Sequence, residues 1–245
     1  MAARLTEVRR RLEAAAHRVH RDPHTIRLVA VSKTFSAASV RDAAAAGQLE
    51  FVENRVQEGL DKIRQLADLA LEWHLIGPVQ SNKARKAVTF GWIQSVDRPE
   101  LVARLDAAAV DLGTRPRVLI QVDLAHEATK HGARLAGIRT LVDAAGGARA
   151  LDLRGLMLIP PLPEQPEDSR RWFRQLRELR DALVADGVPA DRLADLSMGM
   201  SDDFEVAIEE GATIVRVGSA IFGRRETPTP GVNHEPSARS GPYLH

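Results

Sequence analysis

The chain has 245 residues, of which 44% are hydrophobic and 27% are charged, so it can bury a full core; disulfide scaffolds, collagen and disordered chains are excluded. Its 34 lysines and arginines against 33 aspartates and glutamates leave a net charge of +1, which disfavours nucleic acid or a membrane surface as a partner. A chain without cysteine cannot use thiol catalysis, disulfides or zinc–thiolate sites.

The first predicted element is an amphipathic helix that ends before Asp22. Its hydrophobic residues, among them Leu5, Val8 and Leu12, recur at steps of three and four with charged residues between them. These charges leave no room for the apolar core of a secretory signal, and the chain has no run of about 18 apolar residues that would span a bilayer. We therefore expect a cytoplasmic protein without a membrane segment.

Eight short hydrophobic runs follow, and each alternates with a segment of helical period. The runs are 26–32, 50–53, 73–76, 92–96, 118–122, 153–159, 193–196 and 213–217. Such alternation predicts parallel strands joined by helices. A doubly wound open sheet rarely contains eight repeats in about 200 residues, and no G-x-G-x-x-G turn follows the first run.

We therefore predict an α/β fold with a single (β/α)8 TIM barrel over residues 1–225 and an extra N-terminal helix. Residues 226–245 contain four of the 13 prolines and have no periodicity, which predicts a disordered C-terminal tail. In such a barrel the chemistry lies where each strand ends, at the carboxyl-terminal face.

Lys33 ends the first hydrophobic run, and it is one of only five lysines beside 29 arginines. An amine in a partly apolar barrel mouth has a lowered pKa, and a neutral amine can form an imine with an aldehyde or ketone. The alternative interpretation is a lysine that packs its stem at the rim and extends its ammonium into water.

Polar residues also follow the second and third runs. Glu53 and Asn54 fit either a helix cap or a binding site. After the third run, Gly77 begins a loop that leads into a helix, and the pattern favours a structural, hydrogen-bonded role for His74 over a role as a base.

The last two runs end in residues typical of a phosphate site. Ser201 opens a helix after the seventh run, and Gly218 and Ser219 follow the eighth, which is where barrels of this kind commonly bind phosphate. Taken one by one, these residues also fit turns and a helix N-cap. Together with Lys33 they indicate a ligand that has both a phosphate and a carbonyl group, and pyridoxal 5′-phosphate (PLP) has both.

Arg216 sharpens this interpretation because alternation along its strand points it into the barrel. A permanent cation there needs a partner. If that partner is the pyridine nitrogen, the ring stays unprotonated, and carbanion chemistry such as transamination is disfavoured.

Several segments resemble the pyridoxal phosphate homeostasis proteins over roughly residues 5–225. The segments are Ala30-Val31-Ser32-Lys33-Thr34, Glu53-Asn54-Arg55-Val56-Gln57-Glu58, the run from Trp73 to Lys83, Gly155-Leu156-Met157, Ser197 to Asp203, and Arg216 to Gly223. The resemblance implies a barrel similar to the N-terminal domain of alanine racemase that holds PLP as an internal aldimine.

The resemblance also implies a role for each site residue. Lys33 is then the imine lysine, Asn54 lies beside the ring and Arg216 faces the pyridine nitrogen, while phosphate is bound by Ser201, Gly218 and Ser219. The chain departs from the family where Val52 replaces a usual glycine and Asp123 a usual asparagine; Lys130 and Gly132 match.

We predict a non-enzymatic PLP-binding protein for vitamin B6 homeostasis, with any racemase activity weak or absent. The alternative is an alanine-type racemase, which resembles this barrel but needs a second base, usually a tyrosine from a second domain. The chain has one tyrosine, Tyr243, in the predicted tail.

A Schiff-base aldolase fits less well, because such enzymes generally carry their lysine on a later strand. We expect a monomer with PLP-dependent apo-enzymes as candidate partners, and no nucleic acid, membrane or metal.

Overall fold

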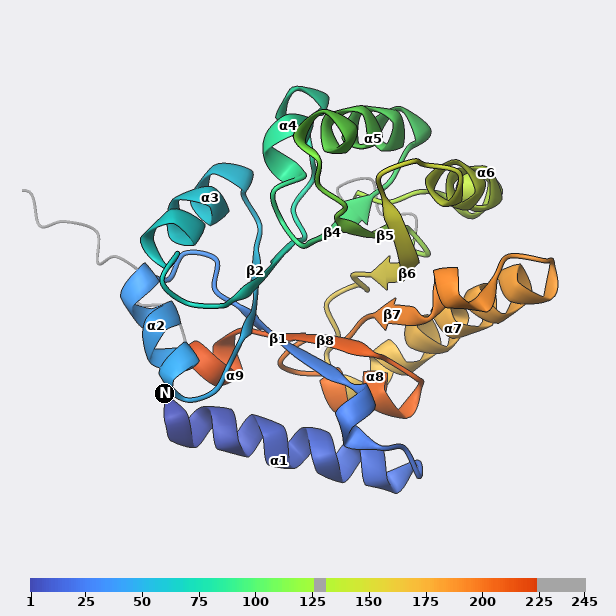
Figure 1. The fold of residues 1–245 in the computed structure, drawn as a ribbon. Coiled ribbons are helices and arrows are strands. Elements are labelled where there is room, and N and C mark those ends of the chain that lie inside the picture. The colour runs from blue at the N-terminus through green and yellow to red at the C-terminus, as the bar shows by residue number, and fades with distance from the viewer. Residues whose placement is uncertain (126–130, 224–245) are drawn as a thin grey trace, which may run out of the picture.

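The computed structural model describes residues 1–125 and 131–223, and it contains a closed barrel of eight parallel strands in chain order. The strands form an inner ring and the helices an outer ring around it (Figure 1). Strand β1 pairs with both β2 and β8, which closes the barrel. The predicted (β/α)8 fold is confirmed. The tail predicted at 226–245 lies outside the described residues, as do Lys130 and Tyr243.

All eight predicted strands are present, each within two residues of its predicted bounds. The strands are β1 (Arg27–Val31), β2 (Glu50–Glu53), β3 (Glu72–Leu75), β4 (Trp92–Val96), β5 (Arg117–Val122), β6 (Asp152–Leu158), β7 (Asp195–Ser197) and β8 (Ile214–Val217). The α-helices are α1 (Ala2–Arg18), α2 (Ala37–Ala45), α3 (Val56–Gln65), α4 (Ala84–Ala87), α5 (Pro99–Leu112), α6 (Leu135–Gly146), α7 (Arg170–Ala185), α8 (Phe204–Glu209) and α9 (Ser219–Phe222). Short 3-10 helices are η1 (Pro23–Thr25), η2 (Ser81–Lys83), η3 (Pro166–Ser169) and η4 (Ala190–Leu193).

The N-terminal helix α1 packs along α8 and α9, at the seam where the barrel closes (Figure 1). Its hydrophobic stripe is buried there, as its period predicts. The side chain of Arg11 forms an ion pair with Glu205 of α8 at 2.8 Å. Arg4 donates from Nε to the carbonyl oxygen of Ile221 at 2.8 Å, near the C-terminal end of α9. Helix α1 therefore stabilises the part of the chain that carries the last strand.

Two hydrophobic layers result from the alternation of side chains along the strands. The larger layer lies between the barrel and the helices. The smaller layer fills the barrel itself, and its members come from seven strands or their ends: Val29, Val52, Ile76, Trp92, Leu119, Met157 and Ile214. Four polar residues share this interior and are at most 2% exposed: His74, Gln94, Ser197 and Arg216. The barrel interior is thus a packed core with a polar path through it.

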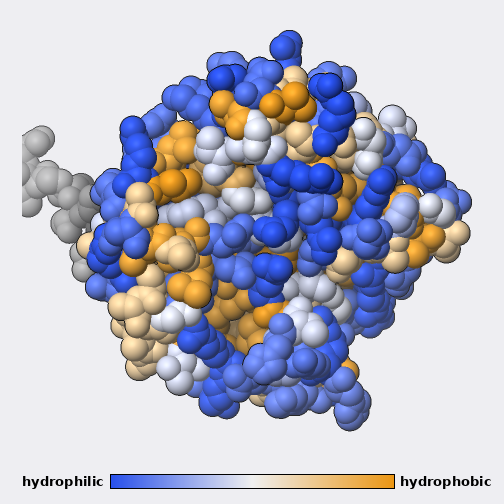
Figure 2. Space-filling model, in the orientation of Figure 1, coloured by the Kyte–Doolittle hydropathy of each residue, from blue (hydrophilic) through white to orange (hydrophobic). Residues whose placement is uncertain are grey.

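Hydrophilic residues cover most of the face shown in Figure 2, and hydrophobic residues gather in smaller patches between them. Among the described residues, no helix combines the length and the hydrophobicity that crossing a membrane requires.

Candidate functional site

All six residues predicted for the site line one cavity of about 520 Å³ at the carboxyl-terminal ends of the strands. They come from four of the eight strand ends, namely those of β1, β2, β7 and β8. The six are Lys33, Asn54, Ser201, Arg216, Gly218 and Ser219. Hydrophobic side chains, including Phe35, Ile76 and Ile159, complete the wall.

The backbone on both sides of Lys33 is held by carboxylates. Lys33 is half-buried and lies two residues after the end of β1. Before it, the hydroxyl of Ser32 donates to Oε1 of Glu53 at 2.6 Å. After it, the amide of Thr34 donates to Oε1 of Glu58 at 2.6 Å. Thr34 has a φ of 71°, which is unfavourable for a β-branched residue, so this turn is strained and needs such support.

Lys62 of α3 joins these carboxylates into one buried cluster beneath Lys33. Its ammonium donates to Oε1 of Glu53 at 2.7 Å, to Oε1 of Glu58 at 2.9 Å and to the carbonyl of Ser32 at 2.8 Å. Burial raises the pKa of Glu53, although Lys62 and Ser32 oppose this. Burial also acts on Glu58, but its hydrogen bonds to Lys62 and to the Thr34 amide hold its pKa below the usual value. The cluster therefore fixes the position from which Lys33 enters the cavity.

Asn54 is exposed at the mouth, and its backbone is fixed by a close contact with the loop after β3. A Cβ on Gly77 would lie 1.7 Å from the carbonyl oxygen of Asn54, so only glycine permits this contact. The sequence left open whether Glu53 or Asn54 caps α3. The N-cap is Arg55, so neither residue is the cap. Val52, where the resembled family has glycine, is buried inside the barrel.

Ser201, Gly218 and Ser219 meet at one end of the cavity. The amide of Gly218 donates to Oγ of Ser201 at 3.2 Å, which leaves the hydroxyl hydrogen of Ser201 available to an acceptor. Gly218 is the N-cap of α9, and a Cβ there would lie 3.2 Å from the Cβ of Val31. The amides of Ile221 and Phe222 both donate to the carbonyl of Gly218 at 2.9 Å, so within α9 the amides of Ser219 and Ala220 are the ones without a helical acceptor. The alternative of Ser201 as the N-cap of α8 is wrong, because that position is occupied by Asp203.

Arg216 projects into the barrel, as alternation predicts, and is 2% exposed. It donates from Nη1 to Oγ of Ser197 at 2.5 Å and from Nη2 to the carbonyl of Leu158 at 2.9 Å. These bonds use two of the five N–H donors of a guanidinium. Burial lowers the pKa of Arg216 to about 10, and the negative charge of Asp203 opposes this. Arg216 therefore remains charged at neutral pH.

A chain of hydrogen bonds runs from Arg216 through the barrel core. The hydroxyl of Ser197 donates to Oε1 of Gln94 at 2.7 Å. Nε2 of Gln94 lies 2.8 Å from Nδ1 of His74, and Nε2 of His74 lies 3.2 Å from Oε2 of Glu50. Because a guanidinium can only donate and a carboxylate can only accept, all the bonds point from Arg216 toward Glu50.

This direction requires a neutral His74 with its hydrogen on Nε2. Burial lowers the pKa of His74, although Glu50 opposes this, so the neutral form is the stable one. His74 also stacks on Trp92 with ring centroids 5.3 Å apart. The structure therefore places His74 in a structural role, with both of its ring nitrogens in hydrogen bonds.

Sequence reasoning assigned no role to three of the polar residues that support the site. Lys62 binds Glu53, which the sequence suggests as a cap or a binding residue, and Gln94 and Ser197 support Arg216. A signal exists for Gln94, since it lies two residues after Trp92 and so shares its inward face in a hydrophobic strand. No local pattern identifies the partner of Lys62.

Comparisons with known proteins agree along nearly the whole chain. A family model described as the alanine racemase N-terminal domain matches residues 4–226. The pyridoxal phosphate homeostasis protein of Pseudomonas aeruginosa is 44% identical over 232 residues, which is 94% of this chain and 98% of that protein.

Solved structures give the same result. PipY of Synechococcus elongatus without PLP has a TM-score of 0.81 and 42% identity, and the match covers 91% of this chain and 100% of PipY. Its structure with PLP bound has a TM-score of 0.76 and 43% identity, with coverages of 87% and 100%. Alanine racemase of Corynebacterium glutamicum is 16% identical with a TM-score of 0.67, covering 95% of this chain and 63% of the racemase, so the likeness shows the fold alone.

Proposed function

The chain belongs to the pyridoxal phosphate homeostasis protein family, and from this premise we propose that it binds PLP in the cavity around Lys33 and acts in PLP homeostasis. One observation carries the proposal: a single cavity of about 520 Å³ combines a half-buried lysine, a buried arginine and a group of hydroxyl and amide donors. When bound, PLP supplies an aldehyde that reacts reversibly with a primary amine. The residues present fit its aldehyde, its phosphate and its ring nitrogen.

We assign the phosphate to the end of the cavity formed by Ser201, Gly218 and Ser219. The hydroxyl of Ser201 accepts from the amide of Gly218, which orients its hydrogen away from that amide. The amides of Ser219 and Ala220 at the start of α9 add donors, and glycine at position 218 has no side chain that would block a close approach. A dianion fits this set of donors.

We assign the pyridine nitrogen to Arg216. A guanidinium has donors only, so it can meet an unprotonated ring nitrogen and cannot accept a proton from a protonated one. The hydrogen bonds to Ser197 and Leu158 hold its orientation. With its nitrogen unprotonated the ring withdraws electrons weakly, which suits a protein that holds the cofactor without transforming amino acids.

We propose Lys33 as the amine that bonds to the cofactor, with Asn54 beside the ring. The carboxylates that hold Ser32 and Thr34 fix the backbone on both sides of Lys33, so its amine is positioned before the cofactor arrives.

A racemase needs a second base on the face of the ring opposite to Lys33. His74 cannot serve, because both of its ring nitrogens are in hydrogen bonds within the barrel core. Asp202 also lines the cavity, but it adjoins Ser201 at the end that we assign to phosphate. The only tyrosine, Tyr243, lies outside the described residues. The lining residues therefore support binding better than racemisation.

Mass spectrometry after borohydride reduction tests the proposal. Reduction fixes the bond between an amine and the aldehyde, so we expect one pyridoxyl group per chain, located on Lys33. Lys33→Ala should lose this group, whereas Lys83→Ala, which changes another lysine at the barrel mouth, should keep it. A pyridoxyl group that stays in Lys33→Ala, or rapid conversion of L-alanine to D-alanine, would contradict the proposal.

We further propose that the protein is a cytoplasmic monomer that delivers PLP to apo-enzymes, and that residues 226–245 form a tail outside the barrel domain of residues 1–225. Delivery predicts that a PLP-dependent apo-enzyme regains activity faster with the loaded protein than with the same protein reduced by borohydride.

Sedimentation velocity measures the state of assembly, and a dimer would contradict the expectation of a monomer. Limited proteolysis that cuts first within 226–245 would support the tail.

A further inference from the structure

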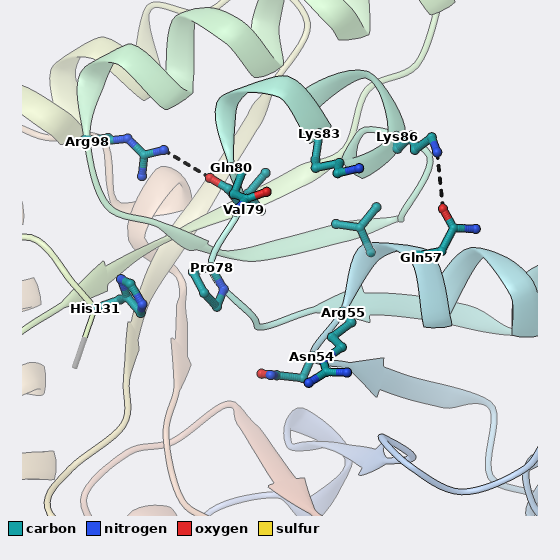
Figure 3. Close-up of a pocket in the computed structure, with 11 residues that line it drawn as sticks. Asn54, Arg55, Gln57, Pro78, Val79, Gln80, Lys83, Lys86, Arg98 and His131 are labelled. Carbon is teal, nitrogen blue, oxygen red and sulfur yellow. Dashed lines mark hydrogen bonds between the residues drawn. The ribbon is translucent and has the colours of Figure 1, made fainter. Parts of the chain in front are cut away.

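A second cavity, of about 570 Å³, opens beside the first at the same end of the barrel. Asn54 lines both cavities, so they are neighbours. The walls of the second cavity come from the segments that follow β2, β3, β4 and β5, whereas the first is built mainly on β1, β7 and β8 (Figure 3). Of the six residues that the sequence predicts for the cofactor site, Asn54 is the one that also lines the second cavity.

The second cavity concentrates positive charge in a chain whose net charge is only +1. Four basic side chains line it, Arg55, Lys83, Lys86 and Arg98, and its described lining residues include no carboxylate. Arg98 is paired with Asp97 at 2.6 Å. The other three have no ion pair with a described residue, so their charge is available to a ligand.

The arrangement of these cations leaves an apolar surface between them. In Figure 3, Lys83 and Lys86 lie on one side of the cavity and Arg55 lies on the opposite side, together with Asn54. Pro78 lies between the two sides (Figure 3). Apolar lining next to several cations suits a ligand that has both an anionic group and a neutral ring.

We propose that this cavity is a second, non-covalent binding site for a small organic phosphate, with the phosphate between Lys83, Lys86 and Arg55. A phosphate monoester has about two negative charges at neutral pH, which suits three basic side chains that form no ion pair with a described residue. The two cavities have similar volumes, about 570 and 520 Å³, so the second can hold a molecule of the cofactor's size. The choice of a phosphorylated form of vitamin B6 as the ligand rests on the proposed function.

Calorimetric titration with pyridoxine 5′-phosphate, which has no aldehyde and cannot bond to a lysine, tests this site. The titrated protein carries a reduced pyridoxyl group on Lys33, so that the first cavity is filled. We expect one saturable site per chain, and binding that weakens as salt concentration rises, because exposed charges are screened. Pyridoxine without phosphate should not bind measurably, and inorganic phosphate should bind more weakly than the ester.

The double variant Lys83→Gln and Lys86→Gln should bind the ester at least about tenfold more weakly, since two charge-assisted contacts are lost. Arg85→Gln is the matched control: Arg85 lies on α4 between these two lysines, is exposed, and does not line the cavity. It should bind like the unmutated chain.

Three results would overturn the second site: no saturable binding, equal binding by the double variant, or an equal loss in Arg85→Gln. Inorganic phosphate binding as tightly as the ester would overturn the assignment of an organic ligand. A failure of the proposed function shows separately, as the absence of a pyridoxyl group on Lys33. In that case the same titration of the unmodified chain and its variants still decides whether the second cavity binds the ester.

Discussion

The two cavities at the barrel mouth hold their positive charge in opposite ways. In the first, Arg216 is 2% exposed, and its guanidinium is held by Ser197 and the carbonyl of Leu158. In the second, Lys83 and Lys86 are exposed, and a single hydrogen bond from Lys86 to Gln57, at 3.2 Å, orients one of them. Water solvates the exposed cations, whereas the protein itself must solvate the buried one.

The two arrangements recognise different properties of a ligand. A buried cation with fixed partners presents its donors in one geometry, so it selects a ligand atom by position. Exposed lysines on flexible stems present charge without a fixed geometry, so they select a ligand by charge. The first cavity is therefore suited to one cofactor that stays, and the second to an anion that exchanges.

The strongest test of this comparison replaces one buried lysine, Lys62, and one exposed lysine, Lys83. Lys62→Met removes the ammonium that lies 2.7 Å from Oε1 of Glu53, a fully buried carboxylate. We expect the free energy of unfolding to fall by roughly 3–5 kcal/mol, because breaking one side of a buried ion pair leaves an uncompensated charge. Urea unfolding followed by circular dichroism measures the loss.

Lys83→Met is the matched control for Lys62→Met, because Lys83 is exposed and has no ion pair with a described residue. We expect its unfolding midpoint in urea to equal that of the unmutated chain. Equal losses in the two variants would show that the buried and exposed lysines do not differ in the way described.

A second test interrupts the hydrogen-bond chain behind Arg216. Gln94→Leu removes the acceptor of Ser197 and the donor to His74, both of which are fully buried. We expect a loss of about 1–3 kcal/mol in the free energy of unfolding, since buried polar atoms lose their partners. PLP should also dissociate faster, because Arg216 is then held less firmly; stopped-flow absorbance measures this rate.

Gln57→Leu provides the comparison in the second cavity, where Gln57 is exposed and accepts one hydrogen bond from Lys86. It should change neither the unfolding midpoint nor the dissociation rate of PLP. A normal dissociation rate in Gln94→Leu would show that the chain stabilises the barrel without positioning Arg216.

The smallest expected effect is a dependence of stability on pH. The pKa of His74 in the folded protein lies below its ordinary 6.5, because burial disfavours the charged ring. Below pH 6.5, His74 of the unfolded chain takes up a proton, whereas the buried His74 of the folded chain stays neutral until a lower pH. The free energy of unfolding is therefore highest above pH 6.5 and falls as the pH drops below it. The slope should reach at most about 1.4 kcal/mol per pH unit.

Urea unfolding at intervals between pH 5.5 and 7.5 measures this slope. His74→Asn should flatten it, and His131→Asn, a change of an exposed histidine in the second cavity, should leave it unchanged. Glu50 does not interfere in this range: burial opposes ionisation, but His74 and Arg27 hold its pKa below 4.5. An unchanged slope in His74→Asn would assign the dependence to other groups.

Much of the site was predictable because the relevant patterns are local. Eight hydrophobic runs separated by helical segments predict a barrel, and parallel strands place all their carboxyl ends on one face. Lys33 and Gly218 directly follow the first and eighth runs, and Ser201 lies in the loop after the seventh, so the order of residues alone brings them together. The alternation of side chains likewise predicts that Arg216 points inward.

The capping alternatives show where local patterns stop. Asn54 and Ser201 are both residue types that favour N-caps, yet the caps of the following helices are Arg55 and Asp203. A shift of one or two residues at a helix start depends on how the whole loop packs, and residue preference decides little there.

Local patterns are enough to predict the strands, the helices between them and the end of the barrel that carries the chemistry, because periodicity is a property of neighbouring residues. Which polar groups meet inside depends on how strands far apart in the chain come together. Ser197 and Gln94 are 103 residues apart and share a hydrogen bond because the barrel closes with a particular register. The second cavity likewise forms from four segments that follow different strands. Its basic residues look like ordinary surface residues in the sequence, and they line one cavity because the barrel brings the strand ends together.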